Sequence, residues 1–304
     1  MNNSESTAKW HIDEKEWWNK YADIMTYQWK LTPELNKTLR QDLEYDYNKY
    51  LFKAGGRLLD LGCGSGWLSM SFSKKGMSVL GIDFSQEQIE AANDLKRENK
   101  LDDVTFECRN LAQWDCSKHE EEFDSVFVSA FLHHLPFSEI ETILYKISFV
   151  LKPGGRAYFY EPLSTSSYKR KLNLLIFDLP INVAIGFLIG RFPKWFNLWT
   201  PWYQSNVEAG YRGNSPHERP LDVEWIRKTC SKSLSITEVK CWHLNSLGFA
   251  MQTMTLKPRV RSLYSRLVTL LYWADRVLLA TFDWRHFASP GRFILCSLKA
   301  EKIR

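Results

Sequence analysis

The sequence predicts an α/β protein with a doubly wound sheet of seven mostly parallel strands, a helical N-terminal cap and helical insertions. Three observations lead to this fold class. Short apolar runs alternate with helix-length amphipathic segments between residues 57 and 161, which is the pattern of βαβ units. A turn with three glycines in five positions, at 62–66, follows the first apolar run. Two β-rich segments return near the end of the chain.

The first five strands follow from short runs of apolar and β-branched residues bounded by glycine or polar residues. Helical periodicity fills the intervals between them. Ser85 with Gln88, and Ser138 with Glu141, have the spacing of a capping box and predict two helix starts. The sequence Lys-Pro-Gly-Gly at 152–155 ends the second of these helices, since proline cannot continue the hydrogen-bond ladder. The strands are expected near 57–61, 78–82, 104–107, 123–129 and 155–161.

The last two strands are expected at 233–242 and 291–299, because both segments have a β-rich composition. They join the sheet late, since two insertions interrupt the chain. The first insertion is rich in Trp, Phe and Leu, and the second contains a long amphipathic helix candidate at 263–282. The chain thus divides into an N-terminal helical cap (1–50), a ligand-binding core (51–162), an aromatic lid or substrate insertion (163–232) and C-terminal core strands (233–304) with a helical insertion at 250–289.

Composition indicates an ordinary globular protein. Of the 304 residues, 44% are hydrophobic and 25% are charged. A net charge of +5 without a basic stripe gives no support to nucleic-acid binding. The six cysteines show neither C-x-x-C zinc spacing nor the density of a disulfide scaffold, which favours a cytoplasmic protein without a structural metal. We expect neither a signal peptide nor a spanning helix, because no apolar segment is suitable.

The glycine-rich turn between Asp60 and Trp67 predicts a ligand site, because glycines let the backbone approach a ligand closely. The dinucleotide fingerprint G-x-G-x-x-G/A fails, since Trp67 or Ser69 falls at its last position. The G-K-[ST] ending of a phosphate-binding P-loop is also missing. The remaining pattern is D-x-G-x-G-x-G.

That pattern, followed by "LGIDFS", "FDSVFVSAFLHHL" and "LKPGGRAYFYEP", resembles the class I S-adenosylmethionine-dependent methyltransferases over about residues 55–162. The resemblance implies a Rossmann-like core that binds S-adenosylmethionine without a metal. It implies that Asp60 and the turn hold the methionine portion, that Asp83 accepts hydrogen bonds from the ribose hydroxyls, and that Phe84 packs on adenine. Asn110 stands where the family often has Asp. The expected cofactor-binding residues are Asp60, Gly62, Cys63, Gly64, Gly66, Asp83, Phe84, Asn110, Leu111 and Ser129.

Each of these positions also has a structural explanation. The glycines could make a tight strand-to-helix crossing, Asp83 could be a turn residue, and Phe84 could belong to the core. The ordered set favours the ligand-binding interpretation over these separate ones.

The candidate catalytic residues follow the fourth and fifth strands, where open α/β sheets bind ligands. A histidine there could remove a proton from a hydroxyl acceptor, and the family's "LHHL" turn favours His134 over His133. Both could instead hydrogen-bond the loop. Glu161 could orient the substrate, act as a base or be an ordinary loop carboxylate. His217 and Glu218 are further candidates from the first insertion.

Aromatic residues crowd the N-terminal segment and the first insertion, as in "KEWWNKYADIMTYQW" and "RFPKWFNLWTPWY". They could seal a lid or line an apolar pocket. Basic residues beside apolar stretches at 168–196 and 259–282 are compatible with peripheral membrane contact or with lid helices packed on the core. The predicted function is methyl transfer to a small molecule, by preference to an oxygen of an apolar or lipid-linked acceptor. The alternative is a non-catalytic sensor or interaction protein that binds the donor or its product.

Overall fold

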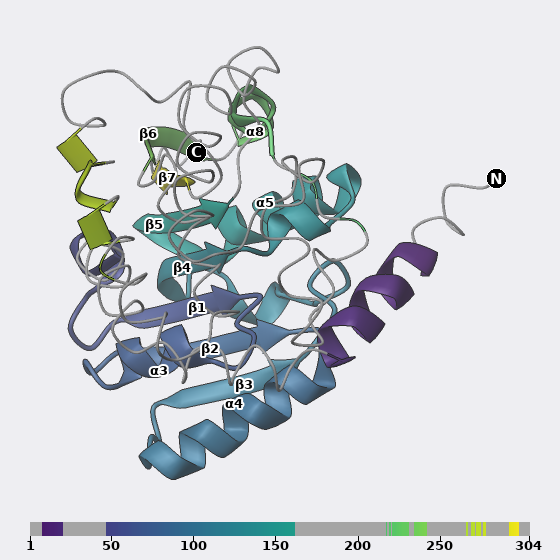
Figure 1. Ribbon diagram of the computed structural model, residues 1–304, viewed down its shortest axis with the longest axis vertical. Helices are drawn as coiled ribbons and strands as arrows, with labels where there is room; N and C mark the ends of the chain where they lie inside the picture. The colour runs from purple at the N-terminus through teal and green to yellow at the C-terminus, as the bar shows by residue number, and fades with distance from the viewer. Residues whose placement is uncertain are drawn as a thin grey trace, which may run out of the picture.

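The computed structural model describes residues 8–20, 47–161, 217, 219, 221–230, 234–241 and 292–297, and residues 266, 269, 270, 272–274, 276 and 277. Within these residues a single sheet has the strand order β3-β2-β1-β4-β5-β7-β6 (Figure 1). The first five strands are parallel, and β7 is antiparallel to both β5 and β6. The strands are β1 (Arg57–Leu61), β2 (Ser78–Asp83), β3 (Val104–Cys108), β4 (Phe123–Ser129), β5 (Leu151–Glu161), β6 (Ser235–Cys241) and β7 (Arg292–Ser297).

Helices connect the parallel strands and cover both faces of the sheet (Figure 1). Strand order reverses between β1 and β4, and open α/β sheets bind ligands outside the carboxyl ends of the strands at such a reversal. Further helices span residues 8–20 and 47–51. The remaining helices are α3 (Trp67–Ser73), α4 (Gln86–Asn99), the short 3₁₀ helices η1 (Ser117–His119) and η2 (Leu132–His134), α5 (Phe137–Val150) and α8 (Val223–Cys230).

Alternate residues of each central strand point to opposite faces of the sheet and supply two hydrophobic cores. Leu58 belongs to the core that contains residues of α3 and α4. Leu59, one position further, belongs to the core that contains residues of α5 and α8. Because both faces are buried, the strands read as nearly continuous apolar runs. The two cores therefore fix the positions of the carboxyl ends of β1, β2 and β4.

The α/β class and the parallel sheet are confirmed, and the predicted strands agree with the observed ones to within a few residues. The capping role of Ser85 is also confirmed, since its hydroxyl accepts a hydrogen bond from Gln88 N at 3.2 Å. The prediction that Ser138 caps the next helix is wrong. Helix α5 begins at Phe137, its N-cap is Pro136, and no side chain caps it. Proline has a suitable fixed φ, −59°, which lets the helix begin one residue before Ser138.

Strand β5 also begins earlier than predicted. It starts at Leu151, directly after α5, and includes the Lys-Pro-Gly-Gly segment. The register against β4 shifts between Phe123 and Ser125, and Gly154 has a φ of +74°. Pro153 and Gly154 are therefore accommodated in an irregular first part of the strand rather than in a separate turn.

Most of the predicted N-terminal cap and of the predicted insertions lies outside the described residues. This applies to most of the first insertion, including Glu218 and the basic and aromatic segments at 169–203, and to the cap apart from residues 8–20 and 47–50. Within 263–282, the described residues are helical, as expected for that segment. No described helix combines the length and apolar character that crossing a membrane requires.

Candidate functional site

The glycine-rich turn connects β1 to α3 at the carboxyl edge of the sheet. Its backbone crosses the end of β2, where Gly62 N and Cys63 N donate to the Ile82 carbonyl at 2.8 and 3.2 Å. A Cβ at Gly62 would lie 2.7 Å from the Phe131 side chain, so this glycine is needed for packing. Gly64 differs, because among the described residues a Cβ there would come within 4 Å of Gln88 Oε1 alone, at 3.7 Å. Close packing against the described residues therefore does not explain this glycine.

Asp83 ends β2 beside this turn and is buried. Its Oδ2 accepts a hydrogen bond from Gly64 N at 3.0 Å, and its Oδ1 accepts one from Ser85 N at 2.9 Å. Burial raises the pKa of Asp83 despite these bonds. A carboxylate offers about four lone-pair sites, so each oxygen can accept a further bond from a ligand hydroxyl.

Asp60 lies in β1 beneath the turn and is also buried. Its Oδ2 accepts a hydrogen bond from Ser69 Oγ at 2.6 Å. Burial, with a smaller contribution from the charge of Asp83, raises the pKa of Asp60 to about 7. Two buried carboxyl groups beside an open stretch of backbone fit a ligand that carries positive charge and hydroxyl groups. S-Adenosylmethionine has both, so the residues present fit the predicted donor.

The other predicted cofactor residues lie around the same edge. Phe84 and Ser129 are half-buried, after β2 and at the end of β4. Asn110 follows β3, but its Oδ1 accepts a hydrogen bond from Ala112 N at 2.9 Å. This bond stabilises the turn in which Asn110 lies. The side chains of Leu111 and Cys63 belong to the two hydrophobic cores, so only their backbones are suited to touch a ligand.

Glu161 and His133 form a buried pair at the ends of β5 and β4. Glu161 Oε1 accepts hydrogen bonds from Phe131 N and Leu132 N, both at 2.9 Å. Its Oε2 lies 2.6 Å from His133 Nδ1. The carboxylate thus holds the η2 loop and one histidine ring together. Glu161 is therefore buried and hydrogen-bonded to the η2 loop rather than exposed as a loop carboxylate.

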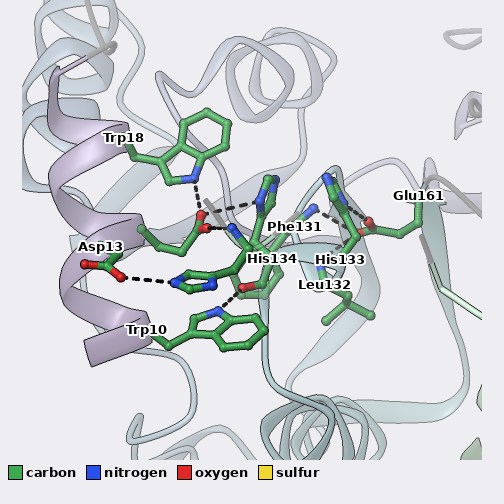
Figure 2. Close-up of polar contacts among 10 residues, drawn as sticks. Trp10, Asp13, Trp18, Phe131, Leu132, His133, His134 and Glu161 are labelled. Carbon is green, nitrogen blue, oxygen red and sulfur yellow. Dashed lines mark hydrogen bonds and ion pairs between the residues drawn. The ribbon is translucent and has the colours of Figure 1, made fainter. Parts of the chain in front are cut away.

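The ring of His134, the next residue, lies beside that of His133, with centroids 3.9 Å apart, but its Nδ1 is directed toward the helix at residues 8–20 (Figure 2). Its Nδ1 lies 3.4 Å from Glu14 Oε2, and its backbone carbonyl accepts a hydrogen bond from Trp10 Nε1 at 2.7 Å. The rings of Trp18 and His134 pack in a T-shaped arrangement, with centroids 5.2 Å apart. Both Glu14 and His134 are buried. The N-terminal helix therefore contacts this histidine through both backbone and side chain.

Two residues of the first insertion complete the contact. The imidazole of His217 stacks on Trp10 with ring centroids 4.1 Å apart. The backbone N–H of His217 donates to Glu14 Oε1 at 3.0 Å. Arg219 N donates to the His133 carbonyl at 3.0 Å. His217, a predicted candidate, thus meets the site through backbone and stacking contacts.

Sequence reasoning missed Glu14 and Arg219. For Glu14 a signal was present, because Trp10, Glu14 and Trp18 recur at helical spacing and share one face. Arg219 has no comparable periodic signal. Among the described residues, no group of three or more His, Cys, Asp or Glu side chains is placed to hold a metal ion.

Comparison with known proteins identifies the core. Residues 58–155 match the family model described as "Methyltransferase domain". A ubiquinone biosynthesis O-methyltransferase of Coxiella burnetii is 26% identical over 155 residues, which are 51% of this chain and 60% of that protein. The protein of the same name from Aliivibrio fischeri is 30% identical over 146 residues, covering 46% and 59% of the two chains. The chain therefore spans about 60% of the length of these relatives.

Solved structures share the fold. A [4+2]-cyclase, SpnF, has a TM-score of 0.51 at 19% identity and covers 84% of this chain and 78% of its own. A geranyl diphosphate C-methyltransferase from Streptomyces coelicolor has a TM-score of 0.50 at 16% identity, covering 86% and 81%. The matched residues therefore form a methyltransferase domain, and this core is similar to those of the class I S-adenosylmethionine-dependent methyltransferases.

Proposed function

We propose that this protein transfers the methyl group of S-adenosylmethionine to a hydroxyl oxygen of an apolar small molecule. The observation that carries the proposal is the arrangement at the carboxyl edge of the sheet. Two buried aspartates lie beside the open turn at Gly64, and two histidines follow β4 with a carboxylate facing Nδ1 of each ring. A site for a cationic donor thus adjoins groups suited to proton removal.

The donor would bind across the turn and the end of β2. Asp83 would accept hydrogen bonds from the ribose hydroxyls, which its remaining lone pairs allow. Asp60 and the backbone at Gly62, Gly64 and Gly66 would face the methionine portion, and Phe84 would pack on adenine. The positive charge of the donor would favour the ionised form of both aspartates.

S-Adenosylmethionine supplies an electrophilic methyl carbon, so the chain's own residues mainly have to orient the acceptor and take up its proton. His134 is the proposed base. Its ring would accept the proton of the acceptor hydroxyl as the oxygen–carbon bond forms and the carbon–sulfur bond breaks. Glu161 would hold His133 and the η2 loop, so that the neighbouring ring is correctly placed.

An apolar acceptor is favoured by the aromatic side chains of the N-terminal helix, of which Trp10 and Trp18 contact His134. The curated relatives are named for ubiquinone biosynthesis, and a quinone-type phenol or catechol is therefore the first acceptor class to test. A cytoplasmic location stays a prediction.

The decisive experiment is incubation of the purified protein with S-adenosylmethionine labelled in its methyl group. The acceptors would be simple catechols, prenylated phenols and an extract of the native host, with mass-spectrometric identification of the labelled product. Binding of S-adenosylhomocysteine would be measured separately by calorimetry. Binding with no methylated product in any arm would overturn methyl transfer and support the non-catalytic sensor.

His134→Ala tests the assignment of the base. General-base catalysis contributes about 10²–10⁴-fold, so turnover should fall by at least about 100-fold. Affinity for S-adenosylhomocysteine should stay within about twofold, because His134 is not expected to bind the donor. An unchanged rate with the same acceptor would remove His134 from the mechanism.

Peripheral membrane contact is a separate proposal. Leu270, Trp273 and Val277 are exposed at helical spacing, and Arg276 lies over the Trp273 ring at 5.2 Å. An exposed apolar face flanked by arginine suits an anionic headgroup layer. Flotation with phosphatidylcholine vesicles, with and without 30% phosphatidylserine as a roughly physiological anionic fraction, provides the test. Absence of binding to both would remove the proposal.

A further inference from the structure

The contacts of Glu14 go beyond those of a residue that merely seals a helix onto the core. Its carboxylate is buried and faces three groups from three parts of the chain. Oε2 accepts a hydrogen bond from Trp18 Nε1 at 3.2 Å and lies 3.4 Å from His134 Nδ1. Oε1 accepts a hydrogen bond from His217 N at 3.0 Å. A buried carboxylate is costly unless such partners compensate it, so its presence here calls for an explanation.

We propose that Glu14 is a positioning residue for His134, supplied by the N-terminal helix, and that the base is complete only when this helix is docked. The proposal rests on the proposed function, because it assumes that His134 takes up the acceptor proton. An ionised carboxylate only accepts hydrogen bonds. A carboxylate facing Nδ1 therefore favours the tautomer with its proton on Nδ1, which leaves the basic lone pair on Nε2.

The same contact stabilises the product of proton transfer. When His134 becomes an imidazolium, the charge of Glu14 lies beside it in a buried environment, where charge interactions are stronger than in water. Among the described residues, the other charged or titratable groups around His134 are His133, whose ring centroid is 3.9 Å away, Asp83, whose pKa His134 influences, and Arg219, whose guanidinium donates to the Leu135 carbonyl at 2.6 Å. His133 already faces Glu161, so Glu14 is the carboxylate available to Nδ1 of His134 among the described residues.

The helix has other anchors that do not involve Glu14. Ser85 Oγ lies 2.7 Å from Asn19 Oδ1, His11 Nε2 lies 2.6 Å from Glu139 Oε1, and Trp10 Nε1 binds the His134 carbonyl. Helix docking and histidine positioning are therefore separable by substitution. Glu14→Gln keeps the size and one acceptor oxygen of the side chain but removes its charge.

The first test reads the histidine directly. The ¹⁵N resonances of the His134 ring, assigned by their loss in His134→Asn, report its tautomer and its titration. Wild-type His134 should hold its neutral proton on Nδ1, and Glu14→Gln should shift the population toward Nε2–H and lower the pKa of His134. Glu16→Gln, an equal charge change at an exposed position of the same helix, should leave both unchanged. Equal resonances in wild type and Glu14→Gln would overturn the proposal.

The second test reads catalysis with whichever catechol or phenol the wild type methylates. Loss of an orienting partner typically costs about 10–100-fold, so kcat should fall at least about tenfold while KM and affinity for S-adenosylhomocysteine change less than about threefold. The acidic limb of the kcat profile should move to lower pH. Glu14→Asp, which keeps the charge, should recover part of the rate. An unchanged kcat and pH profile in Glu14→Gln would overturn the proposal.

The two tests separate failure of this inference from failure of the proposed function. Should wild type methylate no acceptor, the resonance experiment still decides whether Glu14 controls His134. Circular dichroism and tryptophan fluorescence of each variant would establish that the helix stays docked. If Glu14→Gln undocks the helix, Glu14→Asp replaces it in both tests. The shorter side chain moves the charge away from His134 Nδ1, so the tautomer shift and the loss of kcat should have the same direction and a smaller size.

Discussion

Aspartates at the two edges of the sheet differ in the charge of their hydrogen-bond partners. At the amino edge, the Asp124 carboxylate accepts hydrogen bonds from Lys152 Nζ at 2.8 Å, Lys53 Nζ at 2.5 Å and Arg57 N at 2.9 Å. Burial alone would raise the pKa of Asp124, but these partners outweigh it and lower that pKa. At the carboxyl edge, Asp60 and Asp83 accept bonds only from neutral groups among the described residues, and burial raises both pKa values.

The difference distinguishes a structural carboxylate from one that is suited to a ligand. Lysines of the same chain compensate the charge of Asp124, so this carboxylate needs no ligand. Asp60 and Asp83 have no lysine or arginine partner among the described residues, and a bound cation would supply the missing charge. The contrast predicts that changes at the carboxyl edge affect donor binding, whereas changes at the amino edge affect stability.

The largest effect is expected from Asp83→Ala. A hydrogen bond to a charged acceptor is worth about 1.5–3 kcal/mol, so losing two ribose bonds should weaken S-adenosylhomocysteine binding by at least about 100-fold. Isothermal titration calorimetry measures this directly. Asp124→Ala is the control and should bind the product as wild type does. Near-normal binding by Asp83→Ala would refute the ribose assignment.

Asp124→Asn should have the next largest effect, and on stability alone. The amide keeps one acceptor oxygen but loses the charge that two lysines share, so the free energy of unfolding should fall by about 1–2 kcal/mol at pH 7. Because the pKa of Asp124 is lowered by folding, this stabilisation is present at neutral pH and is lost as pH falls below about 4. Urea unfolding of wild type and Asp124→Asn at pH 7 and at pH 3.5 measures the loss of unfolding free energy at each pH. An equal loss at the two pH values would contradict the charge argument.

Asp60 should show the opposite pH dependence. Its pKa is about 7 in the folded, ligand-free protein, above the ordinary value of 3.8. Between these values the folded state holds a proton that the unfolded state lacks, so this group makes the protein less stable as pH rises through that range. A cationic donor favours the carboxylate, so donor affinity should rise about tenfold from pH 6 to pH 8.

Asp60→Asn tests this linkage, because an amide does not titrate. The variant should lose both the fall in stability and the rise in affinity between pH 6 and pH 8. Melting temperatures with and without S-adenosylmethionine provide the measurement. If the pH dependence of affinity persists in Asp60→Asn, another group is responsible.

The part of the fold and of the candidate site at the ends of β1 and β2 could be predicted from the sequence, because it depends on local patterns. The strand ending in Asp60, the glycine turn, the Ser85 cap and Asp83 are each encoded within a few residues. The prediction that Ser138 caps α5 was wrong because the helix begins one residue earlier, after Pro136. The Glu14–His134 contact joins residues 120 positions apart, so no local pattern specifies it. The helical spacing of Trp10, Glu14 and Trp18 indicates a shared face, but it does not specify the partner of Glu14.

The smallest effects are expected from the single lysine variants at the amino edge. Lys53 is 65% exposed and Lys152 39% exposed, so Lys53→Met or Lys152→Met alone should lower the free energy of unfolding by less than about 1 kcal/mol. In each variant the other lysine still compensates Asp124. Removing both leaves the carboxylate, among the described residues, with Arg57 N as its one donor, so the double variant should lose more than the sum of the single losses. Urea unfolding of all three variants measures this coupling. Simple additivity would mean that the lysines do not share the compensation of Asp124, and the contrast between the two edges would then lose its physical basis.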